Sequence, residues 1–184
     1  MKILKRLFVL SVCLSVFAEG AQAKTSCPAE SYVQSAGEAF MAASRKGTAA
    51  AFSSAASRFA DLHSLSLFAL GSYRKDLPKS RETEYVARAR TFMGKFMAQY
   101  GSKFSGSSMA ITSCNEAAGG LNVGTKLSTG QTLTFRIRKA GSGYSVQDVS
   151  VSSIWLAQTM RGKFTSVIRE NNGDIDALMS YLGK

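Results

Sequence analysis

The hydrophobic positions near the C-terminal end of the chain change their spacing from that of a strand to that of a helix. In residues 144–151 the apolar side chains fall first on even and then on odd positions. Because side chains alternate faces along a strand, this change of phase indicates either a bulge near Gln147 and Asp148 or a strand buried on both faces. We favour the bulge, which bends a strand and so favours a concave sheet with a hollow interior.

A helix is predicted directly after this strand. Apolar residues recur at helical spacing through Met160, Phe164, Val167 and Ile168, as on one face of an amphipathic helix. The run Asn171-Asn172-Gly173 ends this helix, because such residues favour turns. A short helix over residues 174–182 is predicted to close the domain.

Three helical regions are predicted in the N-terminal half of the chain. They cover residues 28–47, which end at Gly47, residues 48–73, with Thr48 as N-cap, and residues 85–104. One face of the third helix carries Ala89, Phe92, Phe96, Tyr100 and Phe104. This aromatic stripe fits two interpretations, a helix packed on a solid core and a helix whose rings line a cavity.

Four strands are predicted over residues 107–113, 121–127, 131–139 and 144–151. In the third, apolar and polar side chains alternate, as in a strand with one buried face. Short connections between strands are typical of an antiparallel meander. The predicted fold class is therefore α+β, a curved antiparallel four-stranded sheet wrapped by N-terminal and C-terminal helices.

Three segments share their order and spacing with one known family. They are Leu70-Gly71-Ser72-Tyr73 before the long helix, the strand over residues 133–138 with its hairpin, and residues 143–151 followed by Arg161, Phe164 and Gly173. Together they resemble the MlaC family, periplasmic phospholipid-binding proteins of the Mla transport system that are also described as toluene-tolerance proteins. The similarity runs from about Leu62 to the end of the chain.

The resemblance implies an apolar cavity that takes the acyl chains of a phospholipid while the headgroup stays in solvent. It also implies transfer of lipid between an outer-membrane lipoprotein complex and the inner-membrane Mla ABC transporter complex, which maintains the lipid asymmetry of the outer membrane. The predicted lipid-binding residues are Phe68, Leu70, Tyr73, Phe92, Phe96, Tyr100, Leu133, Phe135, Val149, Val151, Trp155 and Phe164.

Residues 1–23 have the features of a cleavable signal peptide. Three basic residues precede an apolar run over residues 7–17, and Ala21-Gln22-Ala23 fits the small-x-small rule for cleavage. The apolar run is too short to span a bilayer, which needs about 20 apolar residues. We expect cleavage after Ala23, which leaves a single domain over residues 24–184 in the periplasm.

Two cysteines, Cys27 and Cys114, remain after Cys13 leaves with the signal peptide. An oxidising compartment allows them to form a disulfide. The alternative is two separate thiols, since the sequence does not place their Cα atoms within bonding distance. We favour the disulfide.

The formal net charge of the whole chain is +11, which falls by two on loss of the signal peptide. Such a charge indicates nucleic-acid binding in a cytoplasmic protein. Export and the dispersed basic residues, without interleaved aromatic rings, argue against a nucleic-acid partner here. Attraction to anionic lipid surfaces or to acidic membrane-bound partners fits better, and solubility alone is a third use of the charge.

The sequence lacks the residue patterns of a metal site or a catalytic centre. The single histidine, His63, lies near Asp61 without a second ligand at metal spacing. We therefore predict no metal, no cofactor and no enzymatic activity. Asp148 has two interpretations, an ion pair with Arg136 or Arg138 on the neighbouring strand, which we favour, and a general base.

Three hypotheses about function follow. The first is a periplasmic lipid carrier for phospholipid or, as a variant, for a hopanoid-like lipid. The second is an exported basic module with a filled core that binds a protein. The third is a small hydrolase or isomerase that works around Asp148.

Overall fold

The computed structural model describes residues 27–183 as an α+β protein. The helices are α1 (Glu30–Lys46), α2 (Ala49–Phe59), α3 (Leu62–Ala69), α4 (Glu82–Gln99), α5 (Leu156–Glu170) and α6 (Ile175–Leu182). The strands are β1 (Met109–Ala117), β2 (Gly120–Leu127), β3 (Thr132–Ala140), β4 (Gly143–Val151) and β5 (Ile154–Trp155). Short 3-10 helices occupy η1 (Gly71–Asp76), η2 (Lys79–Arg81) and η3 (Gly101–Phe104). The predicted signal peptide at residues 1–23 lies outside the described residues.

The strands form one antiparallel sheet in the order β1-β2-β3-β4-β5. The predicted meander of four strands is present, but the count of four is wrong, because Ile154 and Trp155 add a fifth strand beside β4. Ser152 and Ser153 turn the chain between β4 and β5 with φ angles of 48° and 68°. A strand of two residues is too short to show an alternating pattern in the sequence.

The predicted bulge is confirmed on β4. Arg136 faces Asp148 across the ladder between β3 and β4, whereas Ile137 faces Val146. Gln147 therefore has no partner on β3. An extra residue of this kind increases the local bend and twist of the strand.

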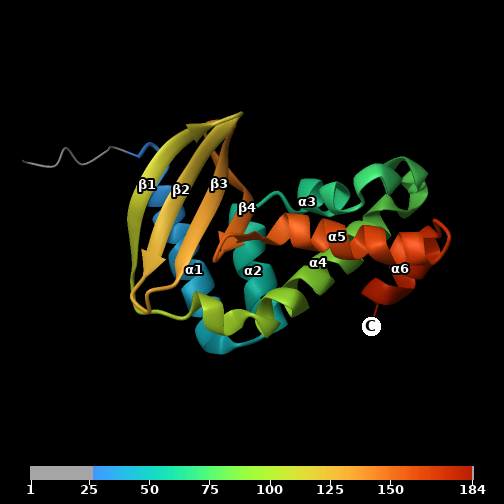
Figure 1. Cartoon of the computed structure of the whole chain (residues 1–184), viewed down its shortest axis with the longest axis horizontal. Helices are drawn as coiled ribbons and strands as arrows, with labels where there is room; N and C mark the ends of the chain where they lie inside the picture. Colours follow the sequence, from blue (N-terminus) through green and yellow to red (C-terminus); the bar gives the residue numbers. More distant parts are fainter. Residues whose placement is uncertain (1–26, 184) are drawn as a thin grey trace, which may run out of the picture.

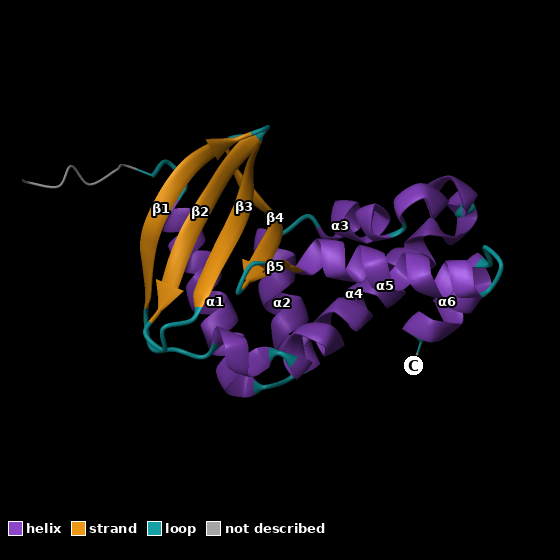
Figure 2. Cartoon of the chain, in the orientation of Figure 1, coloured by secondary structure: helices purple, strands orange, loops and turns teal. Residues whose placement is uncertain are grey.

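The helices lie behind and beside the curved sheet (Figures 1 and 2). Helices α1 and α2 lie against the sheet, whereas α3, α4, α5 and α6 form a group that extends from the side of β4 (Figure 1). Helix α2 packs on α4, and α3 packs on both α4 and α5. The molecule is therefore elongated, with the sheet at one end and the C-terminal helices at the other. Within residues 27–183, no helix combines the length and the apolar character that crossing a membrane requires.

The helical region predicted over residues 48–73 is divided into α2, α3 and η1. The division lies at Ala60, which is extended and forms a β-bridge with Val146 of β4. Asp61 then caps α3 by accepting a hydrogen bond from the Ser64 amide at 2.9 Å. Thr48 is the N-cap of α2, as predicted. The helix is interrupted because this backbone segment pairs with a strand.

Helix α4 ends at Gln99, earlier than predicted, and its buried face is offset from the aromatic stripe. Tyr85, Ala89, Met93 and Met97 are buried, Phe92 and Phe96 are half-buried, and Tyr100 is exposed. The Phe92 ring packs at the edge of the helix, with its centroid 5.4 Å from that of Phe164 on α5. Phe92 therefore lies at the boundary between α4 and the C-terminal helices, whereas Phe104, the last ring of the stripe, is buried against Phe40 and Phe52.

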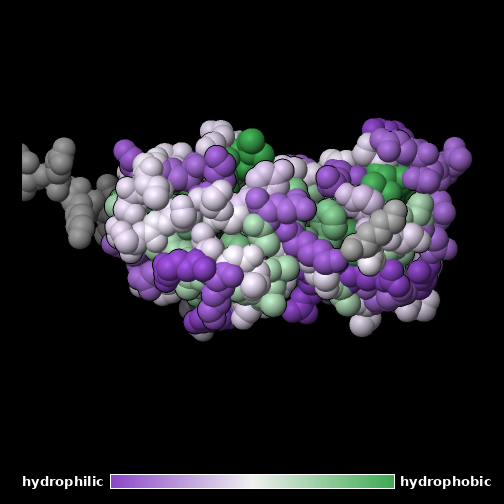
Figure 3. Space-filling view, turned by 90° about the horizontal axis from the view of Figure 1, so that it is seen from below, coloured by the Kyte–Doolittle hydropathy of each residue, from purple (hydrophilic) through white to green (hydrophobic). Residues whose placement is uncertain are grey.

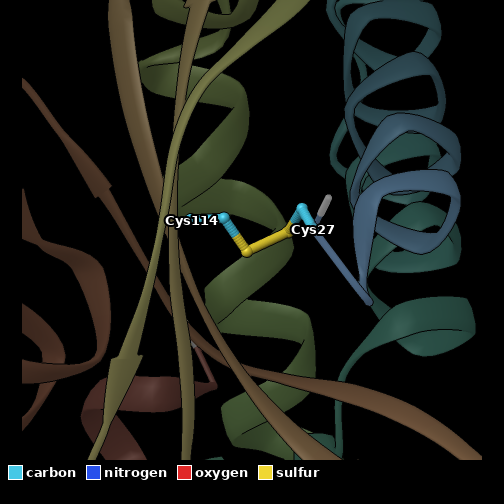
Figure 4. The surroundings of a disulfide bond; sticks show 2 residues. All are labelled: Cys27 and Cys114. Carbon is cyan, nitrogen blue, oxygen red and sulfur yellow. A yellow bond between two sulfur atoms is a disulfide. The ribbon is translucent and has the colours of Figure 1, made fainter. Parts of the chain in front are cut away.

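A disulfide joins Cys27, just before α1, to Cys114 on β1 (Figure 4). The two Cα atoms lie 5.6 Å apart, and 87 positions separate the cysteines in sequence. Cys27 is buried. The bond attaches the start of the helical layer to the first strand of the sheet.

Candidate functional site

A small apolar pocket of about 60 Å³, called the chamber below, lies where the sheet meets the helices. Residues from α1 to α5 and from β4 contribute to its wall. Its apolar lining includes Phe40, Leu62, Leu65, Val149, Leu156 and Met160.

The bulge on β4 determines which side chains of that strand reach the chamber. Val146 faces Ile137 and Val149 faces Phe135 across the ladder, although three positions separate the two valines. In a regular strand, side chains three positions apart point to opposite faces. The extra residue, Gln147, restores the phase, so both valines line the chamber.

Three methionines, Met93 and Met97 on α4 and Met160 on α5, form part of the wall. Methionine is unbranched and has three rotatable bonds, so it adapts its shape to different neighbours. All three side chains are buried. The helical side of the chamber is therefore the side that can rearrange at the lowest cost in packing.

A more polar cavity of about 280 Å³, called the groove below, adjoins the chamber. The groove lies between α3 and the sheet. On the sheet side it is lined by strands β3 and β4 and by the turn between β1 and β2, which is at the top of the sheet in Figure 1. Its lining includes Phe68, Gly119, Gly120, Arg136, Arg138 and Gln147. Leu65, Asp148 and Ala157 line both cavities and form a common wall.

Asp148 in this wall is buried and bound to backbone amides. Its Oδ1 accepts hydrogen bonds from the amides of Val149 at 2.8 Å and Ala157 at 2.9 Å. Burial raises the pKa of this carboxyl, and the two hydrogen bonds and the charge of Arg136 oppose the rise. Ala157 lies in the first turn of α5, so Asp148 connects the bulged strand to the start of that helix.

The predicted ion pair of Asp148 with Arg136 or Arg138 is wrong for the part of the chain that the structure describes. The guanidinium of Arg136 instead stacks over the ring of Trp155, with Cζ 4.2 Å from the ring centroid. The first turn of α5 carries unpaired backbone amides, and Asp148 binds one of these.

The structure distributes the twelve predicted lipid-binding residues over different surroundings. Phe96 and Val149 line the chamber, and Phe68 lines the groove. Leu70, Leu133, Phe135, Val151 and Phe164 are buried in the core, Tyr73, Phe92 and Trp155 are half-buried, and Tyr100 is 49% exposed.

Most of the side chains that line the chamber were not predicted from the sequence. Leu65, Met93, Met97, Leu156 and Met160 were not among the predicted residues, although all line this cavity. Met93 and Met97 lie four positions apart, which places them on one face of a helix. This spacing could have identified the two methionines, but the prediction followed the larger aromatic residues of the same helix.

The surroundings of the single histidine are those of a surface residue. His63 is exposed, and its Nε2 lies 2.8 Å from Oε1 of Glu82. Among residues 27–183, no three histidine, cysteine, aspartate or glutamate side chains come together as a metal site. The described residues thus offer a small apolar pocket beside a larger, more polar hollow with two arginines in its lining.

On the face of the molecule in Figure 3, hydrophobic side chains reach the surface as small patches between hydrophilic ones. The volume of the chamber, about 60 Å³, is also small, well below the roughly 300–1,000 Å³ of a typical ligand pocket. In this structure the chamber is therefore too small to hold a large ligand.

Comparison with known proteins gives one family and a fold. The family described as MlaC protein matches residues 34–184. A solved structure of similar fold is a phospholipid-binding protein from Ralstonia solanacearum in complex with a phospholipid, with a TM-score of 0.67 and 18% sequence identity. The likeness covers 84% of this chain and 92% of that chain. No curated protein matches the sequence.

The family match spans most of the chain, including the bulged strand, the long helix α4 and the C-terminal helices that form the chamber. It confirms the resemblance on which the sequence analysis relied. The chain belongs to the MlaC family.

Proposed function

We infer that this protein is a lipid carrier that holds the acyl chains of a phospholipid in an enlarged form of the chamber. The observation that carries this proposal is an apolar pocket between a bulged strand and a methionine-rich helical wall. Each methylene moved from water into such a cavity contributes about 0.8 kcal/mol. Two acyl chains are therefore retained firmly without any covalent bond.

Lipid uptake requires the chamber to expand from about 60 Å³. Helix α4 packs on α2, α3 and α6, whereas α5 packs on α3, α6 and β4. The two helices carry Met93, Met97 and Met160, which all line the chamber. Rotation of these side chains and separation of α4 from α5 would extend the cavity toward the Phe92 and Phe164 rings.

The choice of phospholipid as cargo is supported by the family and by the Ralstonia solanacearum protein, which was solved with a bound phospholipid. A hopanoid-like lipid is the variant of this proposal. A rigid ring system needs a wide cavity of fixed shape, whereas flexible acyl chains fit a cavity that opens between helices.

The wider role proposed for this chain follows the family. Residues 1–23 would direct the protein to the periplasm, where it would carry lipid between an outer-membrane lipoprotein complex and the inner-membrane Mla ABC transporter complex. This exchange would maintain the lipid asymmetry of the outer membrane. The positive net charge, +11 for the whole chain and lower by two after loss of residues 1–23, favours contact with anionic membranes or acidic partner surfaces. In this role the protein binds and releases its ligand without catalysis.

The small volume of the chamber favours one competing function, an exported protein-binding module with a filled core. Mass spectrometry of the organic extract of protein purified from the periplasm without detergent separates the two. We expect near-stoichiometric phospholipid. A hopanoid-like lipid would retain the carrier and change the cargo, whereas an extract free of lipid from folded protein would support the protein-binding module.

A further inference from the structure

The methionines of the chamber are a set of soft metal ligands. Met93 and Met97 lie four positions apart on α4, and Met160 lies on α5. All three side chains are buried. A thioether sulfur is a soft ligand of the kind that Cu(I) prefers. Both cysteines of residues 27–183 are joined in the disulfide, so in this part of the chain the methionines are the soft ligands that remain available.

The packing of α4 on α5 brings these methionines to the same level. The rings of Phe92 and Phe164 lie 5.4 Å apart, and from this contact α4 runs toward the sheet while α5 comes from it (Figure 1). Met160 lies four positions nearer to the sheet than Phe164, which is about 6 Å along the helix. Met93 and Met97 follow Phe92 by about 1.5 and 7.5 Å along α4. The level of Met160 is therefore between those of the other two.

One carboxylate, Asp148, lines the same chamber. It is 5% exposed, and none of the ion pairs among residues 27–183 includes it. The hydrogen bonds that it accepts from the amides of Val149 and Ala157 both go to Oδ1, which leaves Oδ2 for a cation. Met160 follows Ala157 by three positions and so lies on the same face of α5.

The charge and size of the chamber indicate what kind of ion it fits. A buried charge in a protein is normally paired or bound to a metal, and Asp148 lacks a cationic partner in the described region. A pocket of about 60 Å³ holds a single ion without the expansion that acyl chains require. Methionine has three rotatable bonds, so its sulfur can turn toward such an ion. Mg²⁺ fits poorly, because it requires oxygen ligands and gives up its water reluctantly.

We propose that the chamber of the lipid-free protein binds one soft monovalent cation, Cu(I), with the sulfur atoms of Met93, Met97 and Met160 as ligands and the Asp148 carboxylate as the counter-charge. The site goes beyond the carrier function and does not depend on it, because every ligand belongs to the chain itself. The prediction of no metal was based on the single histidine, His63, whereas this site contains no histidine.

The test titrates Ag(I), a redox-stable analogue of Cu(I), into lipid-free protein in a chloride-free buffer and follows binding by isothermal titration calorimetry. We expect one ion per wild-type protein. The variant Met93→Leu/Met97→Leu/Met160→Leu should lose this binding, because leucine keeps the approximate volume of methionine without the sulfur. Zn²⁺ should not bind to the wild-type protein, since it prefers thiolate, imidazole and several carboxylate ligands.

A matched control changes three other buried methionines. Met41, Met109 and Met179 are buried outside the chamber, so Met41→Leu/Met109→Leu/Met179→Leu should bind Ag(I) as the wild-type protein does. Asp148→Asn tests the counter-charge separately, since asparagine keeps an oxygen for the two backbone amides. Its affinity for Ag(I) should fall by about 10–100-fold, as for other groups that support a metal site.

Several results would overturn this metal site. They are a wild-type protein that takes up no Ag(I), equal loss of binding in both triple variants, unchanged binding in the chamber variant, and equal binding of Zn²⁺. Circular dichroism establishes that each variant is folded. If the chamber variant did not fold, Met160→Leu alone would decide, because loss of one ligand should weaken binding by about tenfold or more. The lipid content of the periplasmic protein tests the carrier function independently of all these results.

Discussion

The side chain of Asp148 on β4 caps α5 by accepting a hydrogen bond from the backbone amide of Ala157 at 2.9 Å. Trp155, at the N-cap position of this helix, makes no side-chain cap of its own. The cap therefore comes from the neighbouring strand, at the wall between the chamber and the groove. Removal of this contact would loosen α5 from the sheet at the place where the lipid is proposed to bind.

Asp148→Asn should be at least as stable as the wild-type protein at pH 7. Burial raises the pKa of the Asp148 carboxyl, so the folded state favours the protonated form. The contribution of protonated Asp148 to the free energy of unfolding is fully present below the ordinary carboxyl pKa of about 4. It is lost as the pH rises through the raised pKa of the folded protein. Asparagine keeps the amide-binding oxygen without the charge. Urea unfolding at several pH values should show the advantage of the variant shrink as the pH falls toward 4.

Asp148→Ala is the matched comparison, since it removes the acceptor of two backbone amides. Loss of such partners costs about 1–3 kcal/mol in the free energy of unfolding. A stability of the alanine variant equal to that of the asparagine variant would show that the hydrogen bonds contribute nothing.

The disulfide between Cys27 and Cys114 should stabilise the protein substantially. It joins positions 87 apart in sequence, and closing a long loop in the unfolded chain typically contributes about 2–4 kcal/mol. Cys27→Ala/Cys114→Ala should lower the free energy of unfolding by this amount in urea titrations. A reductant should lower the wild-type value equally and leave the variant unchanged. Labelling of two free thiols in the unreduced, denatured wild-type protein would refute the bond.

Two helical glycines should respond in opposite directions to substitution by alanine. A Cβ at Gly94 of α4 would lie 2.7 Å from the carbonyl oxygen of Ala49 and nearer still to Oγ of Ser53, so Gly94→Ala should force α2 and α4 apart. A Cβ at Gly162 of α5 meets nothing within 4 Å, and Gly162→Ala should stabilise the helix by about 0.5–1 kcal/mol. Thermal unfolding of both variants checks this. A Gly94→Ala protein as stable as Gly162→Ala would contradict close packing of α2 on α4.

The four longer strands of the sheet could be predicted because the pattern of apolar and polar side chains within each strand indicates which face is buried. In residues 131–139 the alternation of apolar and polar side chains marks the buried face, and in residues 144–151 the change of phase marks the bulge at Gln147. Strand β5 could not be predicted, because its pairing with β4 depends on a turn with two positive φ angles at Ser152 and Ser153. The extended conformation of Ala60 likewise depends on its bridge to Val146.

The candidate site was less accessible to sequence analysis than the fold. Aromatic spacing on α4 identified Phe96, but the chamber faces the side of that helix that carries Met93 and Met97. Which face of a helix lines a cavity depends on its rotation relative to neighbouring elements, and a stripe of large rings does not fix that rotation. The groove was missed because Arg136 and Arg138 were interpreted only as partners for Asp148.

Phe96→Glu should remove bound lipid while the protein stays folded. Phe96 lines the chamber and is half-buried at the edge of α4, so a charged side chain there can reach solvent in the lipid-free protein. With acyl chains in the chamber, the carboxylate would lose its water, which is costly for an unpaired charge. We expect at least about a tenfold fall in lipid per protein, measured by mass spectrometry after detergent-free purification, which corresponds to roughly 1.4 kcal/mol.

Tyr100→Glu is the matched control for this variant. Tyr100 follows Phe96 by one helical turn, and their ring centroids lie 4.9 Å apart, yet Tyr100 is 49% exposed. The same charge at this position stays in water whether or not the chamber is filled, so lipid content should be unchanged. Both proteins should keep the wild-type far-ultraviolet circular dichroism. If Phe96→Glu retained its lipid, the acyl chains would not pass along this wall; if both variants lost it equally, the aromatic edge of α4 as a whole would hold the lipid, and the chamber would not be the binding site.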